Sequence, residues 1–219
     1  MIRILTDSAV DLLPEEAAQL GVTVIPLNVT LEDGTVLRDG IDMTAEYYAH
    51  LRSCHKLPTT SQPSPRLFEQ FYLEAVAAGD EVLGIFLSNE LSGTLQCAKL
   101  AADLANVDNV MFVDSASVCM GQALLVLLAA RLRDSGKTLV QIATALEHAK
   151  KHLHVVAAVD DLKYLRKGGR LPAAVAVAGG MLGIKPIVTV KEGKVALAGK
   201  ARGLPGAYVA LFKKIDELG

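Results

Sequence analysis

Residues 82–104 have the sequence VLGIFLSNELSGTLQCAKLAADL. The aliphatic run from Val82 to Leu87 predicts a buried strand, the polar segment Ser88 to Thr94 predicts a turn, and the apolar spacing from Leu95 to Leu104 predicts a helix. A hydrophobic strand followed by a polar turn and a helix is one half of a β-α-β unit. The stretch therefore predicts one strand of a parallel sheet.

The same order of elements occurs in two other parts of the chain. Ile2 to Leu5 precede the polar triplet Thr6-Asp7-Ser8 and a helix that begins at Pro14, and Val110 to Val113 precede Asp114-Ser115 and a long helix. Repeated strand, polar loop and helix segments favour right-handed crossovers and a parallel sheet with helices on both faces. Ligands of such sheets bind at the carboxyl ends of the strands, so we expect the function to lie in these loops.

The remaining segments extend this α/β pattern. Asp33-Gly34 predicts a hairpin turn, Thr44 predicts the start of a helix to Ser53, and the proline-containing segment Leu57 to Pro65 is expected to lack regular structure. A capping box at Thr138 predicts a further helix. We expect a larger N-terminal domain of residues 1–153.

A smaller C-terminal α/β domain is expected over residues 154–219. His154 to Val159 predict a strand, Leu162 to Lys167 a short helix, Lys185 to Gly199 a hairpin around Glu192-Gly193, and Leu204 to Leu218 an amphipathic helix. No linker rich in Pro, Gly or Ser separates this part from the first.

Composition excludes several classes of protein. The chain has 219 residues, a formal net charge of -2 and 51% hydrophobic residues, which disfavours a nucleic-acid binder and rules out disorder. No apolar run reaches the ~20 residues of a membrane-spanning helix, so we expect no stable membrane insertion. Three cysteines without a C-x-x-C pair indicate a reducing compartment, and we expect a cytoplasmic protein.

Hydroxyl side chains gather in the loops that the sheet is expected to bring together: Thr6, Ser8, Thr60, Ser61, Ser88, Ser92, Thr94 and Ser115. Ser92-Gly93-Thr94 is the clearest anion-binding candidate, because it precedes a helix whose first N–H groups are free. Helix capping is the alternative explanation for each hydroxyl. Three successive hydroxyls, Thr59 to Ser61, exceed what one cap needs, and no histidine or lysine stands near them to create a nucleophile. We therefore favour non-covalent anion binding.

Signatures of the common enzymes are missing, including the phosphate-binding loop and the G-x-S-x-G elbow. The histidines His148, His152 and His154 lack a carboxylate or cysteine placed to complete a metal site, so no metal is expected.

Five motifs together resemble the DegV family over the whole chain: Thr6-Asp7-Ser8, Thr60-Ser61-Gln62-Pro63-Ser64, Leu91-Ser92-Gly93-Thr94, Val113-Asp114-Ser115 and Tyr164-Leu165-Arg166-Lys167-Gly168-Gly169-Arg170. The resemblance implies a bacterial protein of two α/β domains that binds one long-chain fatty acid in a tunnel and is not itself an enzyme. It needs no cofactor, and it presents the bound acyl group to a fatty acid kinase, which makes an acyl phosphate.

The resemblance also assigns residues. It implies that the fatty-acid carboxylate is bound by Thr60, Ser61, Ser92, Gly93 and Thr94, and that Arg202 lies near the head group. It makes Arg166, Lys167 and Arg170, next to Lys163, a candidate docking surface for the kinase. A solvated helix end is the alternative for these basic residues, and a surface arginine is the alternative for Arg202.

Two further expectations concern the tunnel. The segment Leu171 to Gly183, rich in Ala, Val and Gly, suits a wall against an acyl chain, although a core helix would have the same composition. Members of the family usually continue beyond the position of Gly219, so the second domain is expected to be incomplete and the tunnel partly open.

Two other functions stay open at this stage. One is a serine-dependent acyl hydrolase or transferase that uses Ser92 or Ser61 as its nucleophile. The other is a protein-interaction module without lipid, in which the hydroxyls only cap helices.

Overall fold

The computed structural model describes residues 1–160, 162–171 and 183–218. These residues form two compact units, Met1–His152 and Leu153–Gly219. The boundary between these units, after His152, lies one residue before the boundary that the sequence predicts, after residue 153.

The first unit contains the parallel sheet that the sequence predicts. Its four strands are β1 (Ile2–Asp7), β2 (Val22–Ile25), β6 (Glu81–Phe86) and β7 (Val110–Asp114), in the order β2-β1-β6-β7. Every pairing in this sheet is parallel. The α/β class is confirmed.

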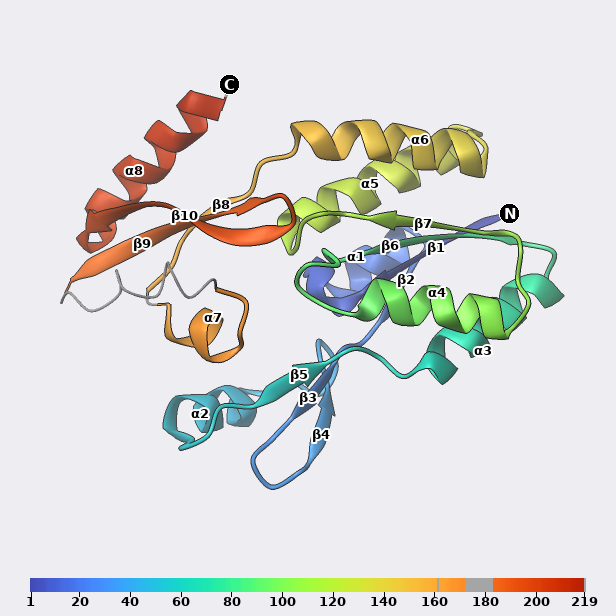
Figure 1. Cartoon of the computed structure of the whole chain (residues 1–219). Helices are drawn as coiled ribbons and strands as arrows, with labels where there is room; N and C mark the ends of the chain where they lie inside the picture. Colours follow the sequence, from blue (N-terminus) through green and yellow to red (C-terminus); the bar gives the residue numbers. More distant parts are fainter. Residues whose placement is uncertain (161, 172–182, 219) are drawn as a thin grey trace. The chain divides into compact units, whose positions relative to one another are not determined.

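Helices cover both faces of this sheet (Figure 1). The pair α3 (Pro65–Ala77) and α4 (Thr94–Leu104) packs on one face, and the pair α5 (Met120–Asp134) and α6 (Leu139–Ala149) packs on the other. The short helix α1 (Pro14–Gln19) lies against β2, and a 3-10 turn at Ser8–Val10 follows β1. As the capping box predicts, Thr138 caps α6.

Aromatic side chains fill the layer between α3 and the sheet. Phe68 and Tyr72 of α3 have no exposed surface, and Phe68 meets Phe86 of β6 edge to face at 5.6 Å between ring centroids. Tyr72 donates a hydrogen bond to the carbonyl oxygen of Ala98 in α4, at 3.2 Å. This packing joins α3 to α4 and so fixes the helix whose N-terminus carries Ser92-Gly93-Thr94.

A second, antiparallel sheet corrects one expectation. Its strands β3 (Asn28–Thr30), β4 (Val36–Arg38) and β5 (Thr59–Ser61) have the order β4-β3-β5, with α2 (Ala45–Ser53) between β4 and β5 in the chain. The hairpin at Asp33-Gly34 and the Thr44 cap are confirmed. The segment Leu57 to Pro65 is not wholly irregular, because residues 59–61 pair with β3. Periodicity cannot reveal so short an edge strand.

The second unit has an antiparallel sheet. Its strands are β8 (Val156–Ala158), β9 (Ile184–Lys191) and β10 (Lys194–Arg202), in the order β10-β9-β8, and its helices are α7 (Lys163–Lys167) and α8 (Gly203–Leu218). The hairpin around Glu192-Gly193 is confirmed. Most of the segment expected to line an acyl chain, Leu171 to Gly183, lies outside the described residues. None of the helices in the described part of the chain is both long and apolar enough to cross a membrane.

Candidate functional site

The carboxyl ends of β1, β6 and β7 hold the turn between β6 and α4 through its backbone. The amide of Leu87 donates to Asp7 Oδ2 at 2.9 Å, and the amide of Ser88 donates to the carbonyl oxygen of Ser117 at 2.8 Å. The amide of Asn89 donates to Asp114 Oδ1 at 3.4 Å. Three successive amides are therefore held by two segments, the end of β1 and the end of β7 with the loop that follows it, and the turn enters α4 in a defined direction.

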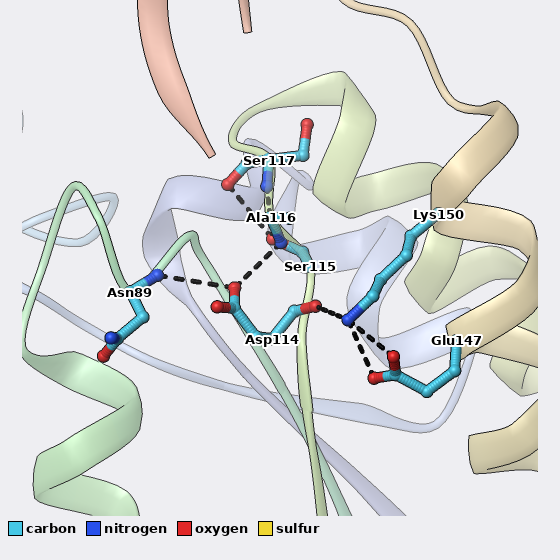
Figure 2. A network of polar contacts seen from close by, with 7 residues as sticks. All are labelled: Asn89, Asp114, Ser115, Ala116, Ser117, Glu147 and Lys150. Atoms are coloured by element: carbon cyan, nitrogen blue, oxygen red, sulfur yellow. Dashed lines mark hydrogen bonds and ion pairs between the residues drawn. The ribbon is translucent and has the colours of Figure 1, made fainter. Parts of the chain in front are cut away.

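Asp114 is the centre of one of these attachments (Figure 2). Its Oδ1 also accepts a hydrogen bond from the amide of Ala116 at 2.8 Å, and its carbonyl oxygen accepts one from Lys150 Nζ at 2.9 Å. Lys150 is paired in turn with Glu147 at 2.7 Å. The network joins the ends of β7 and α6 to the β6–α4 turn.

Ser92 and Thr94 form a hydroxyl pair at the start of α4. Their oxygens Oγ and Oγ1 are 2.9 Å apart, and the amide of Thr94 approaches Ser92 Oγ at 3.4 Å. One hydroxyl must donate to the other, which leaves one proton for a ligand. Thr94 has no exposed surface and Ser92 is partly exposed. Of this pair, Ser92 is therefore the side chain that a ligand can reach.

The first turn of α4 supplies further donors. Its first helical hydrogen bond among the described residues runs from the amide of Cys97 to the carbonyl oxygen of Gly93, at 2.9 Å. Within the described residues, no acceptor takes the amides of Gly93, Leu95 or Gln96. Free amides at a helix N-terminus favour an anion, because they lie at the positive end of the helix dipole and can donate hydrogen bonds to it.

Strand β5 leads into the same region. Thr60 and Ser61 are exposed, and Ser61 pairs with Asn28, whose side-chain amide donates to the carbonyl oxygen of Gln62 at 3.1 Å. The Gln62 side chain lies directly over Gly93, since a Cβ atom added at Gly93 would be 2.8 Å from Gln62 Oε1. The thiol of Cys97 contacts the carbonyl oxygen of Pro63 at 3.4 Å.

These contacts make the segment that carries Thr60 and Ser61 a neighbour of the turn that carries Ser92, Gly93 and Thr94. The two hydroxyl-rich motifs, which lie about thirty residues apart in the chain, thus border one region at the edge of the sheet. Gln62 was not predicted to belong to this region, although it lies within the motif Thr60-Ser61-Gln62-Pro63-Ser64.

Four of the other hydroxyl residues face inward. Thr6, Ser88 and Ser115 are buried, and Thr6 donates to the carbonyl oxygen of Ile85 at 2.6 Å. Ser8 is only partly buried but donates to Asp39 Oδ2 at 2.7 Å. These side chains stabilise the ends of the strands and are not available to a ligand in the way that Ser92 is.

The hydroxyls of the region have no base beside them. In the part of the chain that the structure describes, no histidine, lysine or carboxylate side chain is hydrogen-bonded to Ser92 or Ser61. A serine nucleophile needs such a partner within about 3 Å. The described residues also contain no group of three or more His, Cys, Asp or Glu side chains that could hold a metal ion. The arrangement is suited to binding an anion by hydrogen bonds.

The basic candidates belong to the second unit. Arg202 is the last residue of β10 and is exposed. Arg166 and Lys167 end α7, Arg170 follows them, and all three are exposed. The three residues thus lie in one short, exposed segment, and their roles stay predictions.

The first unit is therefore an α/β unit in which a helix N-terminus and a hydroxyl-bearing loop meet at the carboxyl edge of a parallel sheet, an arrangement suited to binding an anionic group. The family model described as uncharacterised protein, DegV family, matches residues 1–218. The chain belongs to the DegV family, as the five motifs predict.

Relatives and solved structures agree with this assignment. A DegV domain-containing protein of Deinococcus radiodurans is 40% identical over 215 residues, which cover 98% of this chain and 76% of the relative. A DegV family protein from Thermus thermophilus, described by its fatty acid binding, has a TM-score of 0.90 and 38% identity over 99% of this chain and 77% of its own. A stearic acid-binding protein from Eubacterium ventriosum has a TM-score of 0.91 and 29% identity over 100% of this chain and 76% of its own.

Proposed function

We propose that this protein binds one long-chain fatty acid and holds its carboxylate between the Thr60-Ser61 segment and the Ser92-Gly93-Thr94 turn, without catalysing a reaction itself. The observation that carries the proposal is the group of free donors at the start of α4: the outward hydroxyl of Ser92 and the unpaired amides of Gly93, Leu95 and Gln96. Family members with bound fatty acids support the nature of the ligand.

The donor set suits a carboxylate because it is neutral. Hydroxyl and amide donors bind the anion by charge-assisted hydrogen bonds without a buried counter-charge. Most of the binding free energy would come from the acyl chain, at roughly 0.8 kcal/mol per buried CH₂ before association costs. The donors then fix the orientation of the head group.

Replacing Ser92 with alanine tests the site. Ser92→Ala removes one charge-assisted hydrogen bond, so we expect fatty-acid binding to weaken by about 1.5 to 3 kcal/mol. The affinity for stearate should be measured by titration calorimetry, after mass spectrometry of an organic extract has shown what ligand the purified protein carries. Ser135→Ala is the matched control, because Ser135 lies at the far end of α5, where its hydroxyl donates to the carbonyl oxygen of Leu132 at 2.8 Å. Equal affinities of both variants would contradict the placement.

The serine hydrolase alternative makes a different prediction. It requires a covalent acyl adduct on Ser92 or Ser61 after incubation with an activated ester, which intact-mass measurement would detect. We expect no adduct, since neither hydroxyl is hydrogen-bonded to a base in the described part of the chain.

We further propose that the protein presents the bound carboxylate to a fatty acid kinase, which transfers a phosphoryl group from ATP to give the acyl phosphate and ADP. The exposed basic residues Arg166, Lys167 and Arg170 would form the docking surface. Charge reversal in Arg166→Glu/Lys167→Glu should slow acyl phosphate formation by a purified kinase about tenfold or more, with stearate affinity unchanged.

The matched control for docking is Lys191→Glu. It reverses an exposed charge of the same unit at the end of β9, away from α7 in sequence. If this control slows the kinase as much as the α7 variant does, the docking surface is wrongly assigned.

A further inference from the structure

Asp7, at the end of β1, is buried with donors on every side. It has no exposed surface. Its Oδ2 accepts from the amide of Leu87 at 2.9 Å, and its Oδ1 accepts from the amide of Ala9 at 3.0 Å and from Gln122 Nε2 at 3.2 Å. These bonds join the start of the β6–α4 turn, the 3-10 turn after β1, and the first helical turn of α5.

A carboxylate is costly in such a place. Burying an ionised group costs several kcal/mol unless it is paired, and the groups that donate to Asp7 within the described residues are neutral N–H groups rather than cations. Asp39, which accepts from Ser8, adds a like charge nearby. Asp11, which follows the 3-10 turn, is a further acid of this region, and Cys119 at the start of α5 keeps its thiol neutral, with a pKa raised to about 12 by burial and Asp11. An apolar side chain would cost less if Asp7 only filled space.

The side-chain amide of Gln122 allows the hydrogen bonds around Asp7 a second arrangement. Its Nε2 donates to Thr6 Oγ1 at 2.9 Å and to Asp7, but its buried Oε1 has no hydrogen-bond partner among the described residues. A protonated Asp7 would carry an O–H facing three donors, and rotation of the Gln122 amide would offer Oε1 as its acceptor. That rotation gives up the bond to Thr6.

We propose that Asp7 is a positioning residue for fatty-acid binding: its carboxylate form anchors the Leu87 amide and so sets the turn that presents Ser92 and the first amides of α4. This inference rests on the proposed function. Asp7 does not touch the ligand, and it acts through the backbone of residues 87–94.

Protonation of Asp7 should then change the affinity for the fatty acid within a pH range that can be measured. Burial is the main cause that raises the pKa of Asp7 from 3.8 to about 6. Because the folded-state pKa is raised, the stability that this group contributes is fully present below about pH 4 and is lost as the pH rises through about 6. We expect the affinity for the fatty acid to rise over the same pH range, since the ionised form of Asp7 sets the turn. A merely structural role would make the two change together.

The test compares the affinity for stearate at pH 5.5 and pH 8 in the wild-type protein and in Asp7→Asn. We expect wild-type affinity to fall about threefold at the lower pH, because about a quarter of Asp7 stays ionised there, and Asp7→Asn to be about tenfold weaker at pH 8 with little change between the two pH values. Hexadecanesulfonate, whose head group stays charged, serves as a second probe that removes protonation of the ligand itself. Asp108→Asn, at an exposed position before β7, is the matched control and should keep the wild-type profile. Parallel pH profiles for the wild type and Asp7→Asn would overturn the proposal.

A measurement without ligand separates this inference from the proposed function. In the free wild-type protein, the amide proton resonance of Leu87 should titrate with a midpoint near pH 6, and that of Ser135, at the far end of α5, should not. A Leu87 resonance that does not move would overturn the positioning role even if Asp7→Asn fails to fold. Titration of Leu87 in a protein that binds neither probe would instead contradict the proposed function and leave the Asp7–turn connection supported.

Discussion

At the scale of single residues, Gly84 shows how closely the central strand β6 is packed. A Cβ atom added there would lie 2.7 Å from Phe86 Cε2, in the buried core, and 3.1 Å from Cδ1 of Phe112, which packs against that core. We expect Gly84→Ala to lower the free energy of unfolding by about 1 to 3 kcal/mol, because the rings must leave their rotamers. Urea denaturation followed by circular dichroism measures the change.

The control is Gly199→Ala in β10, where the added methyl group would meet Ile187 at an ordinary 3.9 Å. A loss of stability as large as that of Gly84→Ala would show that crowding is not the cause.

Single residues also show where sequence reasoning ends. Hydroxyl type and position predicted Ser92 and Thr94, but only the structure shows that the two oxygens are 2.9 Å apart and that Thr94 is buried while Ser92 is partly exposed. Gln122 carries no local signal, since its partners Thr6 and Asp7 lie more than a hundred residues away in the chain. Such long-range polar contacts cannot be read from periodicity.

At the scale of elements, the sequence predicted those helices, strands and turns that depend on a local pattern of residues. The parallel strands, the capping box at Thr138 and the hairpin around Glu192-Gly193 were predicted, because each depends on residues close together in the chain. Strand β5 was missed, since it exists only through pairing with β3. That pairing matters for the proposed function, because it places Thr60 and Ser61 next to the segment that contacts the start of α4.

At the scale of the whole molecule, we propose that the two compact units are domains of unequal independence. The first, Met1–His152, holds the aromatic cluster of Phe68, Tyr72 and Phe86 within its own sheet and helices. The second has few fully enclosed side chains in its described part; Ile187 and Ala207 are the most buried. A small unit with a thin core is marginal by itself, because apolar burial must offset the conformational entropy of the chain.

Separate expression of the two units tests this difference. A fragment of residues 1–152 should give a dispersed amide NMR spectrum and a single cooperative thermal transition, because all four parallel strands and both helix pairs are present in it. A fragment of residues 153–219 should show poor dispersion and no sharp transition. The N-terminal fragment also retains every donor of the proposed carboxylate site but lacks the second unit. If it folds and yet binds stearate as tightly as the whole chain does, the second unit contributes nothing to the acyl site, and the two-domain model of fatty-acid binding would have to be abandoned for this protein.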